Sequence, residues 1–536
     1  MTSERSHVAP KDDASDEEFE RLLEAAESDP AARMVYEDTM RRVEMLAAGQ
    51  EIRKKRKLSQ RQLADIMGTT QSAISDFESG RVEPQLRTMQ RYARALGHRF
   101  EFAIVSPDVP VAKGGTTSAL FNRLKELALS PLLTTLASQS ERQGKTLQAL
   151  ANAILLPEAI TRPILSMLNA EGWTTSVGEG DDRVYSIVEE ASHVIGVSLE
   201  RDRVVGVLVN MYPDVIKSVT LSLADTSPET VLETAADAVT YLYKHSDRRV
   251  LGVGVCLAGV VRSESGQVDF APELQTDTAP WKKVQLEAAL QDEVQDRVGT
   301  RDLLVAVEND ANALAAYEYL RRGDGSVAVV LLSGTGIGTG FVLEGKLIHG
   351  AHSAAGEGGH TIVDPAGPPC RAKLPHSGCL ETMASAKGIL DGLGIPAETS
   401  SQISAGLATA NDRVRNGDSA TEDAFVTAGQ ALGRFLATTV MLLDPARAVI
   451  YADPHLAKEP SAIATAFRNG VQFGLEEAAA SRLHIDGEPR LEWHPLDDNV
   501  RAIAAGAAAY WYFLKQPSHW APSLRSGAPT SEPVWA

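Results

Sequence analysis

Cysteine is scarce in this chain, with three residues among 536. So few cysteines argue against a disulfide framework and favour a reducing compartment. Long hydrophobic runs are also missing, because the longest, residues 250–261, is broken by glycines and is far shorter than a membrane span. The first residues, Met-Thr-Ser-Glu-Arg-Ser, contain no apolar signal region. We therefore expect a cytoplasmic protein that has no membrane partner.

An excess of positive charge is lacking as well. The formal net charge is −19, which by itself argues against nucleic-acid binding. Residues 51–100 are an exception, because they hold eleven Lys and Arg against five Asp and Glu. A basic island on an acidic body suggests a nucleic-acid-binding module attached to something else. A chain of 536 residues exceeds a single core, so we expect roughly two to four domains.

The basic island has the pattern of short helices with clear start and stop signals. Ser59 and Gln62 form a Ser-x-x-Gln capping pattern, and a glycine soon afterwards ends that helix. Leu63 and Ile66 are expected to face inward from it. We therefore predict an all-α domain over residues 49–103.

The following segment, Gln71-Ser-Ala-Ile-Ser-Asp-Phe-Glu-Ser-Gly80, resembles the recognition helix of phage-repressor-type helix-turn-helix proteins. In that family the first residue of the preceding helix, here Gln60, braces a phosphate. Gln71 would then enter the major groove, where its amide can bond N6 and N7 of adenine. The resemblance implies contacts to double-stranded DNA from Gln60, Gln71, Ser72 and Ser75, with Arg53, Lys54 and Lys55 placed for phosphates. The alternative is a solvated basic helix in a helical bundle.

Four polar motifs mark the second half of the chain. They are Glu308-Asn-Asp-Ala-Asn312, Ser333-Gly-Thr-Gly-Ile-Gly-Thr-Gly340, Ala355-Gly-Glu-Gly-Gly-His360 and Cys379-Leu-Glu381. Carboxylates, an amide and an imidazole together match sugar hydroxyls, each of which both donates and accepts a hydrogen bond. A simpler interpretation is that Asp310 and Asn312 only cap a helix. Capping does not explain the carboxylates about fifty residues downstream.

At these spacings the motifs resemble the ROK family, which contains sugar kinases and sugar-responsive repressors, over about residues 190–515. The resemblance implies an α/β, actin-like or hexokinase-like domain of two lobes over residues 191–515. The alternation of β-type runs and helices also favours an α/β fold with mixed sheets. The family uses Asn309 and Asp310 to bind sugar hydroxyls, while Glu357, His360 and Glu381 would close around the other side of the ring.

The nucleotide-binding elements of the family's kinases are altered. The kinases carry an Asp-x-Gly-Gly-Thr turn after their first strand, whereas this chain reads Ser198-Leu-Glu-Arg-Asp-Arg203 there. Backbone amides can cradle phosphates only where glycines permit close approach. Glycines expected beside the adenine are replaced by Ile450-Tyr-Ala-Asp-Pro454. We therefore expect a protein that is not an enzyme and binds no ATP, and Asp310 would be catalytic only if the chain were a kinase.

The family's zinc motif is also incomplete. His360 and Cys370 stand at the expected spacing, but the middle cysteine position is Ala372 and the last cysteine is displaced to Cys379. His376 could supply the fourth ligand of a His2Cys2 zinc site. Alternatively, the site is empty and the two thiols are small buried hydrophobes. The sequence leaves this question open.

The stretch between the two main domains resembles the winged helix of ROK repressors, over residues 119–190, with a hairpin that turns at residues 178–182. Pro163 falls inside the supposed recognition helix and should kink it, and the wing is acidic. A relic or dimerisation role and direct DNA contact both remain open. The remaining segments are an acidic, helical extension (1–48), a linker (104–118) and a flexible tail (516–536).

Together these patterns predict a multidomain transcriptional regulator, expected to be a repressor. It would bind an inverted-repeat operator as a homodimer or homotetramer and would sense a sugar or sugar derivative. Two rivals are a ROK-type sugar kinase with a DNA-binding extension and an antitoxin-like repressor. The second rival arises because residues 29–97 also resemble toxin–antitoxin repressors.

Overall fold

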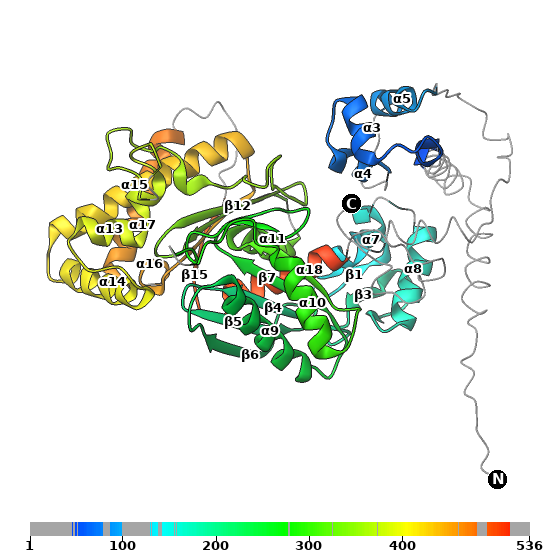
Figure 1. The fold of residues 1–536 in the computed structure, drawn as a ribbon, viewed down its shortest axis with the longest axis horizontal. Helices are drawn as coiled ribbons and strands as arrows, with labels where there is room; N and C mark the ends of the chain where they lie inside the picture. Colours follow the sequence, from blue (N-terminus) through cyan, green and yellow to red (C-terminus); the bar gives the residue numbers. More distant parts are fainter. Residues whose placement is uncertain are drawn as a thin grey trace, which may run out of the picture. The chain divides into compact units, whose positions relative to one another are not determined.

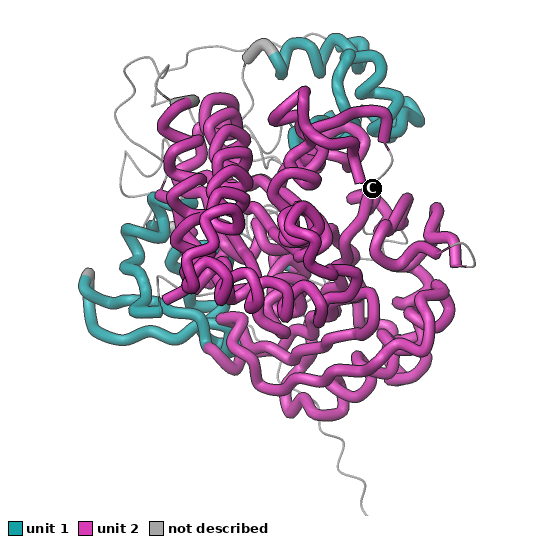
Figure 2. Tube along the Cα trace, turned by 90° about the vertical axis from the view of Figure 1, so that its left-hand side faces the viewer, with its two compact units in different colours: residues 1–136, 141–188, 514–536 teal, residues 137–140, 189–513 magenta. Residues whose placement is uncertain are grey.

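The computed structural model of the chain divides into two compact units, which are described separately (Figure 2). Unit 1 comprises residues 1–136, 141–188 and 514–536, and unit 2 comprises residues 137–140 and 189–513. The structure describes single residues 46, 49, 50, 129 and 156 and ranges 52–78, 86–98, 131–137, 142–154, 158–276, 279–323, 325–371, 374–458, 460–479 and 490–514. The predicted extension (apart from Leu46 near its end), the linker and the tail lie outside these residues, as does Ala372.

The basic part of unit 1 is helical, as the sequence predicts. Its labelled helices are α3 (Gln60–Met67), α4 (Gln71–Glu78) and α5 (Leu86–Ala95). Ser59 caps α3 in a reciprocal capping box with Gln62, and Gly68 ends the helix in the left-handed conformation at φ 60°. Leu63, Ile74, Phe77 and Leu96 form its core. The predicted capping pattern is thus confirmed.

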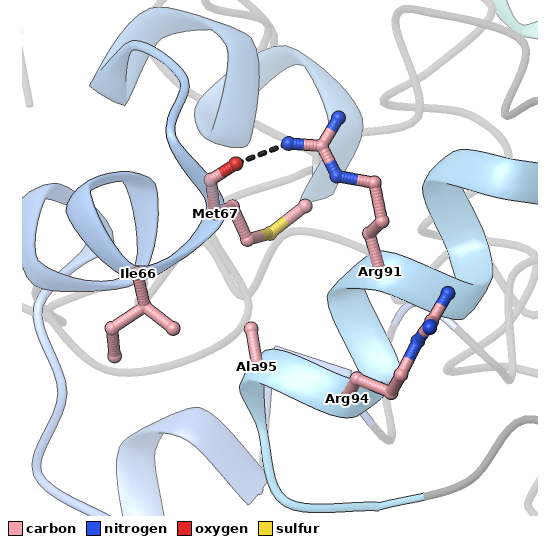
Figure 3. Close-up of a pocket in the computed structure, with 5 residues that line it drawn as sticks. All are labelled: Ile66, Met67, Arg91, Arg94 and Ala95. Carbon is pink, nitrogen blue, oxygen red and sulfur yellow. Dashed lines mark hydrogen bonds between the residues drawn. The ribbon is translucent and has the colours of Figure 1, made fainter.

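The predicted inward position of Ile66 is wrong. Ile66 is 58% exposed, and Met67, one residue further along α3, is buried in its place. Both spacings from Leu63 are helical, but it is Met67 that joins Leu63 in the core of this domain. Ile66 and Met67 line a cleft of about 330 Å³ together with Arg91, Arg94 and Ala95 (Figure 3). The Arg91 guanidinium donates a hydrogen bond to the Met67 carbonyl at the end of α3.

The later part of unit 1 contains α7 (Leu147–Ile154), α8 (Glu158–Ala170) and a small sheet. Its strands β1 (Lys145–Thr146), β2 (Thr174–Val177) and β3 (Val184–Ile187) pair antiparallel in the order β1-β3-β2. The predicted hairpin is present, and the 3-10 helix η2 (Gly180–Asp182) lies at its tip. Pro163 lies inside α8, which is assigned as one helix from Glu158 to Ala170.

The first lobe of unit 2 is built on a mixed five-stranded sheet (Figure 1). Its strands, in spatial order, are β10 (Leu304–Asn309), β7 (Val250–Leu257), β4 (His193–Leu199), β5 (Arg203–Val209) and β6 (Val215–Ser222). Helices α9 (Pro228–Lys244) and α10 (Leu286–Val298) pack into its hydrophobic core. The sheet also meets α18 (Val500–Leu514), where a Cβ at Gly254 would lie 2.0 Å from the Ala505 carbonyl oxygen. Glycine therefore allows α18 to approach the sheet.

The second lobe has its own mixed five-stranded sheet. Its strands, in spatial order, are β13 (Lys346–Leu347), β12 (Ile337–Leu343), β11 (Val327–Leu332), β14 (Arg447–Ala452) and β15 (Arg490–Pro495). The helices of this lobe are α12 (Leu380–Ala384), α13 (Ala386–Gly392), α14 (Ser400–Arg415), α15 (Ser419–Leu443), α16 (Pro454–Ala457) and α17 (Ala462–Ala479). Helix α11 (Asp310–Arg322) follows β10 of the first lobe and packs against β11 and β12 of the second. The predicted two-lobed α/β architecture is confirmed.

One helix among the described residues, α15, is long and apolar enough to cross a membrane. It lies along α17, and 56% of its most apolar window is buried inside the protein. Phe425, Leu432 and Leu436 of α15 belong to the hydrophobic core of the second lobe. Its apolar composition is thus accounted for by packing within the lobe.

Candidate functional site

Three carboxylates lie along the segment that leads into β12. The Thr335 hydroxyl donates to Glu273 Oε1 at 2.6 Å, and the backbone N–H of Ile337 donates to Glu381 Oε2 at 3.3 Å. A Cβ at Gly336 would lie 2.9 Å from Glu381 Oε2, and one at Gly338 would lie 3.9 Å from Asp310 Oδ1. The glycines of the Ser333–Gly340 motif therefore allow carboxylates close to the backbone.

Asn309 holds the entry to α11. Its Oδ1 accepts the N–H groups of Ala311 and Asn312 at 2.9 and 3.1 Å, and its Nδ2 donates to the Gly259 carbonyl at 2.9 Å. Asn309, rather than Asp310 or Asn312, is the residue that caps the helix. Because its amide is held on both sides, Asn309 has a fixed orientation beside Asp310.

Asp310 is a buried carboxylate at the first position of α11. It is 4% exposed, its Oδ1 accepts the N–H of Ala311 at 2.9 Å, and its Oδ2 lies 3.8 Å from Arg501 Nε. Burial raises the pKa of Asp310 to about 6, although Arg501 acts in the opposite direction, and Glu273 adds to the rise. Asp310 is thus a proton-binding group close to physiological pH.

The second lobe contributes three of the predicted sugar-binding residues, Glu357, His360 and Glu381. Glu357 is exposed and precedes the 3-10 helix η3 (Gly358–His360), on which His360 is half-buried. Burial raises the pKa of Glu381, His360 opposes that rise, and Glu273 and Glu357 add to it. Glu381 thus lies within electrostatic range of His360, Glu357 and Glu273. The structure therefore brings predicted site residues from separate motifs into one neighbourhood.

Sequence reasoning missed Glu273 and Arg501. Glu273 lies in a turn after β9 (Val268–Phe270), and Arg501 lies near the start of α18, close to the C-terminal end of unit 2. No local motif marks either residue, because each reaches the site through the fold.

A buried hydrogen-bond group holds the residue next to Asn309. Glu308 accepts from His349 Nε2 at 2.7 Å, from the Tyr512 hydroxyl at 2.5 Å and from Asn312 Nδ2 at 3.1 Å. Burial acts to raise the pKa of Glu308, but His349 and the hydrogen bonds prevail and lower it. Glu308 is therefore an ionised anchor that ties β10 to α18 and to the segment after β13.

The turn between β4 and β5 is closed by ion pairs. The Glu200 N–H donates to the Arg203 carbonyl at 2.9 Å, and Arg203 Nε lies 2.8 Å from Glu200 Oε2. Arg203 also pairs with Asp498 at 2.8 Å, and Arg501 Nη1 lies 3.5 Å from Glu200 Oε1. Acidic and basic side chains thus occupy this turn, where the family's kinases have glycines.

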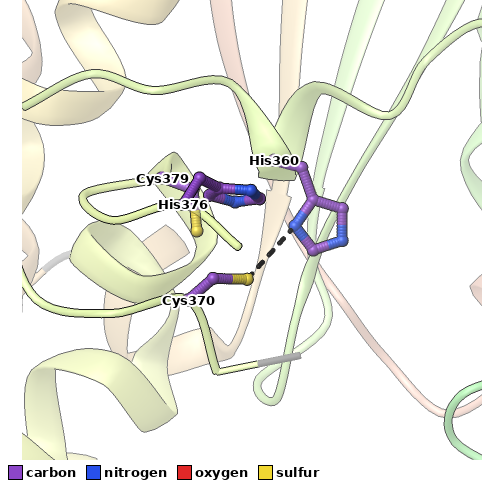
Figure 4. Close-up of side chains that lie close together, drawn as sticks. All are labelled: His360, Cys370, His376 and Cys379. Atoms are coloured by element: carbon purple, nitrogen blue, oxygen red, sulfur yellow. Dashed lines mark hydrogen bonds between the residues drawn. The ribbon is translucent and has the colours of Figure 1, made fainter. Parts of the chain in front are cut away.

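Four possible metal ligands converge in the second lobe (Figure 4). The ligand atoms of His360, Cys370, His376 and Cys379 all lie within 4.8 Å of one another. Cys370 Sγ is 3.8 Å from His360 Nδ1, and Nε2 of His376 is buried with no hydrogen-bond partner. Both thiols are buried. Two sulfur and two nitrogen donors at this separation fit a tetrahedral zinc site after a small contraction.

The predicted DNA-contacting residues differ in their exposure to solvent. Ser72 is exposed and Gln71 and Ser75 are half-buried on α4, and Lys54 and Lys55 are exposed in the preceding helical segment. Gln60 Nε2 donates to Glu78 Oε2 at 3.2 Å.

Arg53 is different and requires a correction. It is 9% exposed, and its guanidinium pairs with the buried Glu78 instead of standing on the surface for phosphates. The run of five basic residues at 53–57 gave no signal of this difference, because Glu78 lies twenty-five positions away.

Comparison with known proteins agrees with this organisation. Two lobes on mixed sheets define an actin-like or hexokinase-like α/β domain, which follows a helix-turn-helix domain. Residues 194–458 match the ROK family and residues 50–101 match the helix-turn-helix family. The chain therefore carries a ROK family domain behind an N-terminal helix-turn-helix domain.

Curated relatives include both kinases and repressors. A glucokinase from Halalkalibacterium halodurans is 32% identical over 216 residues, which cover 38% of this chain and 61% of the relative. A xylose repressor from Caldicellulosiruptor bescii is 27% identical over 248 residues, which cover 44% of this chain and 58% of the relative. The chain thus spans about three-fifths of the length of these relatives.

A solved structure shares the fold. It is a ROK family transcriptional regulator described as a homolog of the E. coli MLC protein, with a TM-score of 0.56 and 19% identity. The superposition covers 74% of this chain and 99% of that one.

Proposed function

We propose that this protein is a cytoplasmic transcriptional repressor that binds DNA through its helix-turn-helix domain and senses a sugar through its ROK domain. The observation that carries the proposal is the presence of both domains in one chain. The likeness to xylose repressors supports the regulatory role, although glucokinases are matched over the same domain.

Helix α4 would be the helix that contacts the DNA bases. Gln71, Ser72 and Ser75 lie at positions i, i+1 and i+4, so they share one side of the helix. Lys54 and Lys55 would supply sequence-independent phosphate contacts. Glu78 and Arg53 would hold the helices that present these side chains. A dimer would read an inverted repeat with half-sites about one helical turn apart, or a multiple of it.

The later part of unit 1 has the element order of a winged helix, and we propose that it is a winged-helix domain. The acidic wing tip, with Glu179, Asp181 and Asp182, would repel phosphates. We therefore propose that this part of unit 1 takes part in dimerisation, or is the relic of a DNA-binding domain, and does not contact DNA.

Sugar binding would use Asn309, Asp310, Glu357, His360 and Glu381, with Glu273 added by the structure. Carboxylates accept hydrogen bonds from hydroxyls, and a half-buried imidazole can accept or donate. A ligand held between the lobes would favour one lobe arrangement. It can control the DNA-binding domain only if the free and DNA-bound forms of the protein differ in affinity for it.

We further propose that the chain does not transfer phosphate. The ion-paired turn at Glu200 and Arg203 offers no glycine amides to a nucleotide, and Glu200 would repel phosphates. The likeness to glucokinases supports the rival reading that the domain is a kinase.

Zinc is proposed as a structural ion of the ROK domain. His360, Cys370, His376 and Cys379 would hold it, and bound zinc would supply a fixed cross-link for the segment between Glu357 and Glu381. His360 would then have a fixed ring orientation beside the sugar site.

The test selects operators from random DNA with the full chain and maps them by footprinting. The selected sites are then titrated with neutral hexoses and pentoses, amino sugars and sugar phosphates. A repressor should protect an inverted repeat, and one class of sugar should change that protection. Gln71→Ala should weaken selective protection by losing discrimination at one adenine-bearing position, whereas Asp310→Ala should keep protection but lose the sugar response. Protection that survives Gln71→Ala and Lys54→Ala together would assign DNA reading to another part of the chain.

A further inference from the structure

Resting on the proposed sugar-sensing function, we infer that the ROK site selects a sugar that bears a protonated amino group, and that Glu273 is the residue that sets this preference. The inference starts from how many acceptors the site offers. Glu273, Glu381 and Asp310 each use one carboxylate oxygen to accept a hydrogen bond from the protein, from Thr335, Ile337 and Ala311 respectively. Among the described residues, the structure shows no hydrogen bond to their other oxygens.

The nearby positive charges are already engaged. Arg501 is shared between Asp310 and Glu200, at 3.8 and 3.5 Å. Lys387 donates its backbone N–H to the Gly334 carbonyl, but its ammonium pairs with Asp391 at 3.3 Å and Glu398 at 2.9 Å. One arginine is therefore shared by two carboxylates, and no ion pair to Glu273 is found among the residues that the structure describes.

An anionic, acceptor-rich site discriminates among sugars by charge. An ammonium supplies three donors and a positive charge, whereas a hydroxyl supplies one donor and none. Phosphate or carboxylate groups on a sugar would bring like charges together, which is unfavourable. A neutral sugar can still satisfy some of the acceptors, so charge sets the preference rather than binding itself.

Glu273 is the residue to test because it adds a carboxylate beside those of Glu381 and Asp310. Its Oε1 accepts from the Thr335 hydroxyl at 2.6 Å, next to the backbone of residues 336–338 that the other two carboxylates approach. Glu273→Gln keeps the size of the side chain and an acceptor for the Thr335 hydroxyl while it removes the charge. Asp292→Asn, at an exposed carboxylate on α10, is the matched control.

The experiment compares matched sugars, so that ring stereochemistry cancels. Glucose and glucosamine, galactose and galactosamine, and mannose and mannosamine are each titrated calorimetrically into the full chain at pH 7. The N-acetyl and 6-phosphate derivatives of each serve as uncharged and anionic arms. In any pair that binds, the amino sugar should bind about tenfold more tightly than its neutral partner, the gain of one charge-assisted hydrogen bond. The N-acetyl form should lose this gain, and the 6-phosphate should bind more weakly than the neutral sugar.

Glu273→Gln should reduce the advantage of the amino sugar to about threefold or less, while binding of the neutral sugar shows that the variant is folded. Asp292→Asn should leave the advantage unchanged. Equal binding of neutral and amino sugars, tighter binding of the phosphate, or an advantage that survives Glu273→Gln would overturn the inference alone. Failure of every sugar to bind would overturn the proposed sugar-sensing function together with it.

Discussion

Arg53 and Glu78 form a buried, two-point ion pair inside the helix-turn-helix domain, with Nε–Oε1 at 2.7 Å and Nη2–Oε2 at 2.9 Å. The pair joins the first helical segment to the end of α4. The Tyr92 hydroxyl donates to Glu78 Oε1 at 2.6 Å, and Arg53 Nη1 donates to the Leu58 carbonyl at 2.9 Å. Gln60 of α3 also donates to this carboxylate, so four helical segments meet there, which fixes the helix that would read DNA.

The first prediction follows from that pair. Arg53→Met should destabilise the helix-turn-helix domain by about 3–5 kcal/mol, because it leaves a buried carboxylate without its cation. Lys54→Ala, at the exposed neighbouring position, should change stability by less than about 0.5 kcal/mol. Hydrogen exchange of the full chain measures the effect locally: α3, α4 and α5 should lose protection in Arg53→Met, and the strands of the ROK domain should not. Unchanged protection in α4 would mean that the pair is dispensable.

The second prediction concerns DNA recognition. Gln71→Ala should lose discrimination at one adenine-bearing position of the operator, at a cost of about 1–3 kcal/mol there. Lys54→Ala should instead weaken binding to all sequences alike and flatten the salt dependence. Binding isotherms at several salt concentrations, on the selected operator and on single-base variants, separate the two effects. A uniform loss for Gln71→Ala would contradict base readout by this side chain.

The third prediction concerns metal. Protein purified without chelator should contain about one zinc per chain, because structural zinc sites bind tightly. His376→Ala should lower that content sharply, and Cys370→Ser should do the same, since each removes one of four ligands. Elemental analysis is the measurement, with Cys256→Ser, a buried cysteine outside the cluster, as the control. Metal-free protein that keeps full sugar affinity would show that the cluster has no structural role there.

The fourth prediction concerns pH. The pKa of Asp310 is raised from 3.8 to about 6, so the folded protein binds this proton more tightly than the unfolded chain does. Protonation of Asp310 therefore stabilises the folded protein below pH 4, and this stabilisation is lost as the pH rises through 6. Asp310→Asn stays neutral, so it should be more stable than the parent by about 2–3 kcal/mol at pH 8, and the difference should shrink toward pH 4.

Chemical denaturation at several pH values, followed by intrinsic fluorescence, measures that difference. Glu344→Gln, at an exposed carboxylate after β12, should show no such pH-dependent gain. A gain for Asp310→Asn that is independent of pH would mean that the titration of Asp310 is not its source.

The fifth prediction concerns catalysis. The full chain should not phosphorylate any hexose with ATP, since the turn at Glu200 lacks amides that could hold phosphates. A coupled nucleotide assay across the sugar panel measures this. Turnover that disappears in Asp310→Asn would identify a kinase and contradict the prediction. Replacement of residues 200–202 by Gly-Gly-Thr should not restore activity by itself, because the segment at 450–454 is also altered.

Local sequence was informative wherever neighbours along the chain decide the structure. Ser59 and Gln62 predict their own capping box, and the Gly178–Asp182 segment predicts its own hairpin, since these interactions span only a few residues. The motif at residues 308–312 likewise indicates the start of a helix, although Asn309 is the residue that caps it. The ROK and helix-turn-helix resemblances were found on such short patterns, and the matches confirm them.

Tertiary structure decided what depends on residues far apart in sequence. The basic run at 53–57 does not reveal that Arg53 turns inward, because its partner Glu78 arrives from another helix. Nor does the sequence reveal that Glu273 and Arg501 join Asp310, since they come from a turn and from the last described helix. The sequence by itself determined the two family resemblances and predicted most of the polar residues of the candidate site. The fold determined their charge balance and protonation, because burial and long-range ion pairs exist only once the chain has folded.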